Sequence, residues 1–261
     1  MLEIKDLTIQ YGDKPPVVEN FSLSLKKGEI ITIVGESGSG KSTVLSSILG
    51  LLPNGGKIIS GDIIYNGESM LSKSLNQWRE LRGTEITMIS QDSGGTLNPI
   101  RKIGKQFVEY IQTHSKMSAK EAEEKAEDMF SKVNLPDPEI IMKSYPHQLS
   151  GGMKQRVGIA MALTFHPKII LADEPTSALD VITQAQIVKE IMDLRKKFDT
   201  SIIMVTHNLG VAAYISDKII VMQNGKIVDA GNKNEVIENP KSEYTKKLLE
   251  AVPEIGGERL V

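Results

Sequence analysis

The octapeptide GESGSGKS at residues 35–42 constrains the fold of this chain more than any other segment. It fits the phosphate-loop pattern G-x-x-x-x-G-K-[ST]. The apolar run IITIV at 30–34 precedes it, and the helix-like stretch STVLSSILGLL at 42–52 follows it. Because the pattern requires a strand before it and a helix after it, this context predicts a loop that binds the phosphates of a nucleoside triphosphate.

The residue types in the loop suit that chemistry. Glycines at 35, 38 and 40 let successive backbone N–H groups converge on phosphate oxygens without interference from a Cβ. Lys41 brings a positive charge near the β and γ phosphates, and the Ser42 hydroxyl is a ligand for Mg²⁺. The predicted nucleotide-binding residues of the loop are Gly35, Glu36, Ser37, Gly38, Ser39, Gly40, Lys41, Ser42 and Thr43.

A pair of carboxylates follows a second apolar strand, because IILA at 169–172 leads directly to Asp173 and Glu174. Open parallel sheets bind their ligands beyond the carboxyl ends of their strands. We therefore expect Asp173 to hold Mg²⁺ through water and Glu174 to accept a proton from the attacking water. An Asp-Glu pair after a strand also begins many ordinary loops, so it is the phosphate loop in the same chain that favours the catalytic interpretation.

Two further strands also end in polar side chains. The run IIMV at 202–205 leads to His207, which is predicted to hydrogen-bond the γ-phosphate, and ITMI at 86–89 leads to Gln91. The amide oxygen of Gln91 is a candidate ligand for Mg²⁺ or for the attacking water. Tyr11, after the first strand, is a candidate for stacking on a purine ring. The alternative for Gln91 and for Tyr11 is an ordinary turn residue.

A second group of small residues opens a helix at LSGGMKQR, residues 149–156. Ser150, Gly151 and Gly152 precede the apolar stretch VGIAMAL, and a helix N-terminus after small residues is suited to bind an anion. One nucleotide should not need two such sites on one chain.

Composition limits the remaining alternatives. The 261 residues carry a net charge of -2 with a pI near 6.1, so no overall basic field favours nucleic acid. The absence of cysteine excludes disulfides, thiolate metal sites and iron–sulfur clusters, and it fits a reducing compartment. We see no signal peptide and no window of about 18 apolar residues, so we expect a soluble chain.

These motifs together resemble an ATP-binding cassette, the ATP-hydrolysing subunit of ABC transporters, and the similarity runs from about residue 1 to 250. The resemblance implies ATP and Mg²⁺ as ligands, and it assigns a name and a role to each motif. These are Tyr11 as the adenine-stacking aromatic, residues 35–42 as Walker A, Gln91 as the Q-loop, residues 168–174 as Walker B with Glu174 as general base, Ser177, Ala178, Leu179 and Asp180 as the D-loop, His207 as the switch histidine, and Ser42, Gln91 and Asp173 around Mg²⁺.

The resemblance also explains the second anion site. In this family two cassettes meet head to tail, and the signature sequence LSGG of one covers the γ-phosphate held by Walker A of the other. The implied residues of this site in the partner are Leu149, Ser150, Gly151, Gly152 and Met153.

The implied fold is an α/β P-loop NTPase of the ABC-ATPase type, with a mostly parallel sheet core, an antiparallel β subdomain and an inserted helical subdomain. We expect one domain over 1–261. Its core and β subdomain are predicted at 1–91 and 166–240, its helical signature subdomain at 92–165, and a C-terminal tail at 241–261. NG at 224–225, between two apolar runs, predicts a β-hairpin near the end.

Three segments resemble the oligopeptide, dipeptide and nickel importers within the family: YPHQLSGGMKQRVGIAMAL at 145–163, LNP at 97–99 and NPKSEYTKKLLEAVP at 239–253. The loop DSGGTLNP at 92–99 departs from that subfamily, and the chain also lacks the cysteine-rich tail found in many oligopeptide members. The implied cargo is a peptide, nickel or a metal-chelator complex.

The resemblance implies a peripheral protein on the cytoplasmic face of the membrane. Its implied partners are two transmembrane permease subunits, a second cassette that is a paralogue rather than a copy, and indirectly an extracytoplasmic substrate-binding protein; nucleic acid is not among them. The alternative is a soluble cassette that acts on DNA or ribosomes. Such proteins usually carry a coiled coil, a zinc insertion or two cassettes, and this sequence shows none of these. A non-hydrolysing nucleotide sensor is disfavoured because Glu174 and His207 are both present.

Overall fold

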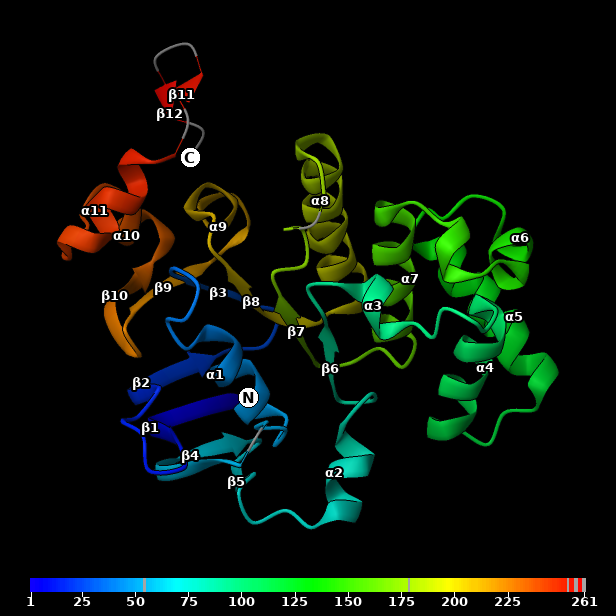
Figure 1. Ribbon diagram of the computed structural model, residues 1–261, viewed down its shortest axis with the longest axis horizontal. Helices are drawn as coiled ribbons and strands as arrows, with labels where there is room; N and C mark the ends of the chain where they lie inside the picture. Colours follow the sequence, from blue (N-terminus) through cyan, green and yellow to red (C-terminus); the bar gives the residue numbers. More distant parts are fainter. Residues whose placement is uncertain (54, 178, 253, 256–257, 260–261) are drawn as a thin grey trace. The chain divides into compact units, whose positions relative to one another are not determined.

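The computed structural model describes residues 1–53, 55–177, 179–252, 254–255 and 258–259 (Figure 1). The chain divides into two compact units. Unit 1 comprises Met1–Trp78 and Ser201–Val261, and unit 2 comprises Arg79–Thr200. Helix α2 (Leu75–Leu81) contains residues of both units. The subdomain limits expected from the sequence stay a prediction.

Unit 1 holds both terminal segments of the chain and most of its strands. Its helices are α1 (Lys41–Ile48), α9 (Leu209–Ile215), α10 (Lys233–Glu238) and α11 (Glu243–Glu250). Its strands are β1 (Leu2–Tyr11), β2 (Val18–Leu25), β3 (Ile30–Val34), β4 (Gly56–Tyr65), β5 (Glu68–Ser69), β8 (Ser201–Thr206), β9 (Lys218–Gln223), β10 (Lys226–Asn232), β11 (Glu254–Ile255) and β12 (Glu258–Arg259).

Parallel strands form the centre of unit 1. Strand β3 pairs in parallel with β8 on one side and with β9 on the other. Every residue of β3 and of β8 is buried, which is what their continuous apolar runs predicted. Strand β10 continues this sheet antiparallel to β9.

A separate antiparallel sheet in unit 1 has the strand order β2-β1-β4-β5. From Phe21 to Leu25, the side chains of β2 alternate between buried and exposed positions, as the sequence predicted. The alternation in β1 is interrupted at Asp6, whose φ of 47° accompanies a shift in the register of both neighbours. The hydroxyl of Ser22 accepts the Asp6 N–H and so stabilises this irregularity.

The predicted hairpin joins β9 to β10. Asn224 and Gly225 take φ values of 48° and 79°, so both central residues have positive φ, as in a type I′ turn. A second turn with the same residue types, Asn66 and Gly67, joins β4 to β5 with φ values of 51° and 86°. Both turns have the short-range sequence signal that favours hairpins.

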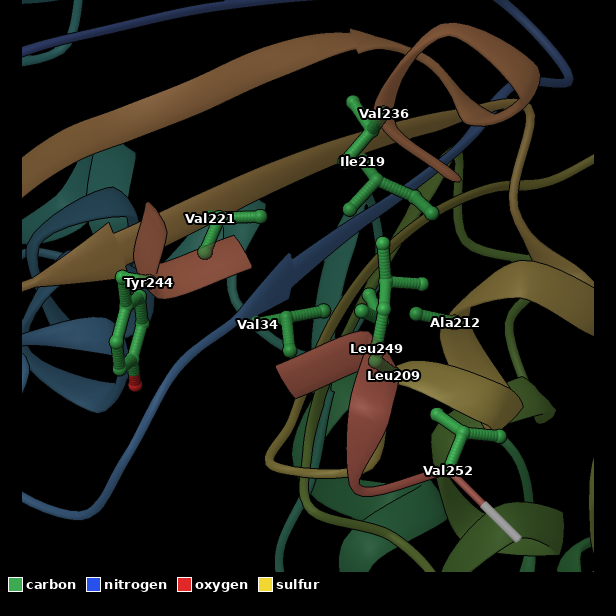
Figure 2. Close-up of a cluster of buried hydrophobic side chains, with 9 residues drawn as sticks. All are labelled: Val34, Leu209, Ala212, Ile219, Val221, Val236, Tyr244, Leu249 and Val252. Carbon is green, nitrogen blue, oxygen red and sulfur yellow. The ribbon is translucent and has the colours of Figure 1, made fainter. Parts of the chain in front are cut away.

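A cluster of nine buried side chains packs β3 and β9 against α9, α10 and α11 (Figure 2). Burial of each large apolar side chain contributes about 1.5–3 kcal/mol. The cluster therefore fixes α9, α10 and α11 against the parallel sheet. Its members are Val34, Leu209, Ala212, Ile219, Val221, Val236, Tyr244, Leu249 and Val252.

Unit 2 contains two paired parallel strands and a group of helices (Figure 1). The helices α4, α5, α6 and α7 contact one another within it, as the helical signal between residues 97 and 165 predicted. Its elements are β6 (Ile86–Ile89), α3 (Ser93–Thr96), α4 (Ile103–His114), α5 (Ala119–Lys132), α6 (Pro138–Lys143), the 3-10 helix η1 (Pro146–Gln148), α7 (Gly151–Leu163), β7 (Ile169–Asp173) and α8 (Val181–Phe198).

The helix after the phosphate loop is shorter than the sequence suggested. We expected it to reach residue 52, but α1 ends at Ile48 because Gly50 adopts a φ of 61°. In the ranges that the structure describes, no helix is long and apolar enough to cross a membrane.

The two Asn-Gly turns provide a stability test. A Cβ at Gly225 would lie 2.5 Å from the Val17 carbonyl oxygen, whereas a Cβ at Gly67 would meet nothing within 4 Å. Gly67→Ala should cost about 1 kcal/mol of unfolding free energy through its positive φ alone. Gly225→Ala should cost about 2–4 kcal/mol, because the steric overlap adds to the same strain. Urea unfolding followed by circular dichroism measures both, and equal losses would contradict the close approach at Gly225.

Candidate functional site

The phosphate loop leaves the end of β3 and turns into α1 within six residues. Gly38 and Gly40 have φ values of 82° and 98°, which only glycine adopts at low cost. Ser37 and Gly38 are exposed, and so is Ser42 in the first turn of α1. The backbone is thus open to a ligand where the sequence pattern predicts phosphate contacts.

Neighbouring segments of unit 1 hold the loop closely from outside. A Cβ at Gly35 would lie 2.2 Å from the Met222 carbonyl oxygen, so only glycine fits there. The Gly225 N–H donates to the Ser39 carbonyl at 3.2 Å, so the turn between β9 and β10 also supports the loop. These contacts fix the loop before any nucleotide binds.

Lys41 lies inside the loop with its side chain almost fully buried. Its Nζ donates to the carbonyl oxygens of Gly35 and Glu36, each at 2.7 Å, and to the Ser39 hydroxyl at 3.3 Å. An ammonium held against the interior of the loop is suited to a phosphate anion. The loop geometry therefore fits the triphosphate that the sequence implies.

His207 leaves the sheet at the same level as the phosphate loop. Val34 pairs with Thr206, so the next residues, Gly35 and His207, follow adjacent parallel strands at the same edge. The exposed His207 is followed by Asn208, whose side chain accepts the N–H groups of Gly210 and Val211 and begins α9. Within unit 1 the structure thus brings the predicted switch histidine to the loop's end of the sheet.

Tyr11 is the last residue of β1, and its ring packs on the backbone of Gly56 in β4. A Cβ at Gly56 would lie 2.5 Å from the ring. One side of the half-buried ring is thus packed on a residue with no side chain. The contact of Tyr11 with a purine stays a prediction.

In unit 2, Gln91 lies just beyond β6, and Asp173 is the last residue of β7, the parallel partner of β6. Ile89 pairs with Ala172, so the two chains leave the sheet at neighbouring positions. Asp173 is half-buried and Gln91 is exposed. The pairing supports the sequence argument that polar groups gather at the carboxyl ends of parallel strands.

Glu174 has a φ of 43°, a left-handed conformation that costs a non-glycine residue about 1–2 kcal/mol. Its carbonyl accepts the N–H of Ser177 at 3.2 Å and the Ser177 hydroxyl at 3.1 Å. The first D-loop residue is therefore bonded directly to the predicted general base. Ala178 of the D-loop lies outside the described residues.

Sequence reasoning missed a second residue that supports the D-loop. The side-chain amide of Gln184 donates to the carbonyls of Thr176 and Leu179, at 2.9 and 3.1 Å. Its position, one turn beyond the helix cap Asp180, was the signal that could have found it. Hydrogen bonds from Thr183, first from its backbone N–H and then from its hydroxyl, lower the pKa of Asp180.

The signature segment begins α7. Ser150 is the N-cap, and its hydroxyl accepts the Met153 N–H at 3.3 Å, as expected for a serine before a helix. Ser150 and Gly151 are exposed, and Leu149 is buried. A Cβ at Gly152 would lie 3.0 Å from the Thr183 methyl group, which places the start of α7 beside the start of α8.

An ion pair fixes α7 on α8 further along. The guanidinium of Arg156 donates to both carboxylate oxygens of Glu190, with distances between 2.8 and 3.2 Å. Both side chains are more than four-fifths buried. No local pattern could have revealed this pair, because 34 residues separate its members.

Comparison with known proteins identifies the family. The sequence profile described as "ABC transporter" matches residues 18–177, which is more than half of the chain. The chain belongs to the ABC transporter family. The family resemblance inferred from the sequence motifs is confirmed. This ABC transporter ATPase groups with the ATP-binding proteins of the oligopeptide, dipeptide and metal-staphylopine importers.

Two relatives show the level of similarity. The oligopeptide transport ATP-binding protein OppD of Bacillus subtilis (strain 168) is 44% identical over 257 residues, covering 97% of this chain and 72% of that protein. The metal-staphylopine import system ATP-binding protein CntD of Staphylococcus aureus (strain NCTC 8325 / PS 47) is 42% identical over 252 residues, covering 95% of this chain and 92% of that protein.

A solved structure confirms the fold. The ATP-binding cassette MJ0796, in a dimeric post-hydrolysis state bound to ADP and Pi, superposes with a TM-score of 0.77 at 29% identity. The alignment covers 89% of this chain and 99% of that one. The predicted cassette fold, with a mostly parallel sheet, an antiparallel β subdomain and a helical subdomain, is therefore confirmed, and this ABC transporter ATPase is of the type that binds ATP and ADP.

The ion pair between Arg156 and Glu190 yields a stability prediction. Arg156→Ala should lower the unfolding free energy by about 1–3 kcal/mol, because Glu190 is left partly buried without its partner. Arg156→Lys should recover less than half of the loss, since an ammonium does not reproduce the two-pronged contact.

The matched control for this pair is Lys120→Ala. Lys120 pairs with Glu124 on the surface of α5, with side-chain exposures of 86% and 67%, so its loss should cost under about 0.5 kcal/mol. Urea titration at neutral pH measures all three variants. An Arg156→Ala protein as stable as the Lys120→Ala control would contradict a stabilising role for the pair.

Proposed function

We propose that this chain is the ATP-hydrolysing subunit of a binding-protein-dependent importer for peptides, nickel or a metal-chelator complex. The observation that carries the proposal is the combination, on one chain, of a formed phosphate loop with a separate capped signature helix that begins at exposed Ser150 and Gly151. A nucleotide in the loop of one cassette would need the signature helix of another. The names of the similar OppD and CntD proteins support the transport assignment.

In this proposal the loop 35–43 binds the triphosphate, with Tyr11 stacked on the adenine. The backbone N–H groups and the ammonium of Lys41 hold the β and γ phosphates. The Lys41 ammonium donates to three loop oxygens, which keeps its charge inside the loop. His207 hydrogen-bonds the γ-phosphate, because it leaves the sheet level with Gly35.

Glu174 is the proposed general base, which takes a proton from the attacking water. The hydrogen bonds from Ser177 to its carbonyl stabilise the left-handed backbone conformation of Glu174. They therefore fix the direction in which the Glu174 side chain leaves the backbone. The strain in this backbone is offset by the folded unit around it, as is usual at reactive sites.

Mg²⁺ is the proposed metal, held by the Ser42 hydroxyl, the Gln91 amide and Asp173. Over the described part of the chain, no three His, Cys, Asp or Glu side chains gather as a metal site. A carboxylate together with neutral oxygen donors suits Mg²⁺, which keeps several waters and substrate phosphates as ligands. The ion when bound neutralises charge on the phosphates.

The residues Leu149 to Met153 are proposed to complete the site of a partner cassette, together with the D-loop residues Ser177 to Asp180. We further propose that 92–165 acts as the signature-bearing helical subdomain. The proposed partner cassette is a paralogue rather than a copy of this chain. Two permease subunits are proposed to couple to the cassettes, and a substrate-binding protein is proposed to deliver the cargo. The chain would lie on the cytoplasmic face of the membrane.

Replacement of the general base tests the chemistry. Glu174→Gln should retain ATP binding and lose about 10²- to 10⁴-fold in turnover, because an amide does not accept the proton. Phosphate release and binding of a fluorescent ATP analogue are measured on the purified chain. Glu124→Gln, on the exposed face of α5, is the control with the same chemical change. Turnover near the wild-type value would remove Glu174 from the role.

A bulky charge at the signature tests the site shared between cassettes. Ser150→Arg should leave ATP binding by the isolated chain intact and prevent ATP-dependent association with its partner cassette, measured by light scattering in the Glu174→Gln background. Ser150→Ala removes the cap hydrogen bond without adding bulk, so it should associate. Association of Ser150→Arg at the wild-type level would contradict the shared site.

The assignment to transport is tested by co-purification. The tagged Glu174→Gln chain is held with MgATP and recovered from solubilised membranes of its host. Two permeases with a second cassette are the expected partners. Ribosomes or nucleic acid without membrane proteins would instead support the soluble, non-transport cassette.

A further inference from the structure

Helix α11, Glu243–Glu250, reaches the phosphate loop from the far end of the sequence. It buries Tyr244, Thr245 and Leu249 on one face, and all three belong to unit 1 with the loop itself. In Figure 2, Tyr244 lies at one edge of the buried cluster and its hydroxyl points away from the other members. The Tyr244 ring is therefore part of the buried cluster, while its hydroxyl lies outside that cluster.

The Tyr244 hydroxyl meets the backbone of the phosphate loop. It accepts the N–H of Glu36 at 2.9 Å, across a separation of 208 residues. Glu36 is the second residue of the GESGSGKS segment, and its carbonyl accepts the Lys41 ammonium. The peptide unit before Glu36 is thus held by Tyr244 at its N–H and by Lys41 at the Gly35 carbonyl, and the unit after Glu36 is held by Lys41. Burial raises the pKa of Tyr244, so the hydroxyl stays protonated at neutral pH.

The start of α11 is anchored independently of the loop. Asp229, a buried carboxylate of β10, accepts the N–H groups of Lys241 and Ser242 at 2.8 and 3.3 Å. The Ser242 hydroxyl then accepts the N–H of Tyr244 at 3.1 Å. The backbone that carries Tyr244 is therefore positioned by the sheet, which makes its hydroxyl a fixed acceptor.

The other end of α11 packs near the helix that follows the switch histidine. Leu249 and Val252 share the buried cluster with Leu209 and Ala212 of α9, whose first residue comes two positions after His207 (Figure 2). Val34, the last residue of β3 before the loop, is in the same cluster. Helix α11 thus packs in the same cluster as Val34, next to the phosphate loop, and as the start of α9, next to His207.

We propose that Tyr244 is a positioning residue for nucleotide binding, which holds the first turn of the phosphate loop through the Glu36 N–H. The inference rests on the proposed function, in which this loop binds ATP. Without the hydroxyl, the Glu36 N–H has to find water, and the turn that carries the Gly35 and Glu36 carbonyls gains freedom. Binding would then have to order the loop first, which weakens affinity.

The test is Tyr244→Phe, which removes one oxygen and keeps the buried ring. We expect KM for ATP to rise about 2- to 10-fold with kcat nearly unchanged, because a neutral hydrogen bond of this kind contributes to ground and transition states alike. The melting temperature should stay close to that of the wild type. Wild-type KM in this variant would overturn the proposal.

Two tyrosines serve as matched controls. Tyr214→Phe, at an exposed position of α9, should change nothing. Tyr110→Phe removes a hydroxyl that donates to the Gly83 carbonyl at 3.0 Å within unit 2, so it tests loss of a hydrogen bond that does not involve the loop. If Tyr110→Phe raised KM as much as Tyr244→Phe, the effect would be one of general stability and the positioning role would be wrong.

A second readout does not depend on catalysis. Hydrogen exchange of the Glu36 amide, followed by NMR in the nucleotide-free chain, should be faster in Tyr244→Phe than in the wild type, with amides of unit 2 unchanged. Unchanged exchange at Glu36 would overturn the proposal.

Lys41→Ala separates the two hypotheses. If the wild-type chain bound a fluorescent ATP analogue no better than Lys41→Ala, the proposed function would fail and the role of Tyr244 with it. If the wild type bound well and Tyr244→Phe bound equally well, only the role of Tyr244 would fail.

Discussion

The parallel pairing of β3 with β8 is the constraint on which the nucleotide-binding half of the site depends. Both strands are buried along their full length, so their hydrogen bonds form away from water and a slip in register would cost many of them. With Val34 opposite Thr206, the phosphate loop and His207 must leave the sheet together. The same edge then carries the loop that is proposed to bind phosphate and the imidazole that is proposed to sense it.

Around that edge, the loop is supported from several distant parts of unit 1. The β9–β10 turn donates to Ser39, a Met222 carbonyl excludes any side chain at Gly35, and Tyr244 accepts the Glu36 N–H. A loop with two glycines at positive φ has high conformational entropy when unfolded, so external contacts of this kind are needed to preorganise it. Unit 2 uses the same approach around its D-loop, where the Gln184 amide donates to the carbonyls of Thr176 and Leu179.

The helices and strands differ in how well the sequence predicted their extent. Strands β3, β7 and β8 were predicted within one residue because each is a short apolar run followed by polar residues. The extent of α1 was predicted less well, because Leu51 and Leu52 continue an apolar pattern that the positive φ of Gly50 interrupts. An isolated glycine near the end of a helical pattern is a C-cap signal, and the apolar residues beyond it outweighed that signal in the prediction.

The sequence by itself determined the phosphate loop, the carboxylates at the end of β7, the start of the signature helix and the family, because these depend on residue types at short spacing. Only the tertiary structure decided which distant groups complete them: Tyr244 on Glu36, Arg156 on Glu190 and Gln184 on the D-loop. Each of the first two contacts joins residues more than 30 positions apart, where no periodicity operates and many partners of equal chemistry exist. Burial and register select one partner among them, and both are properties of the folded chain.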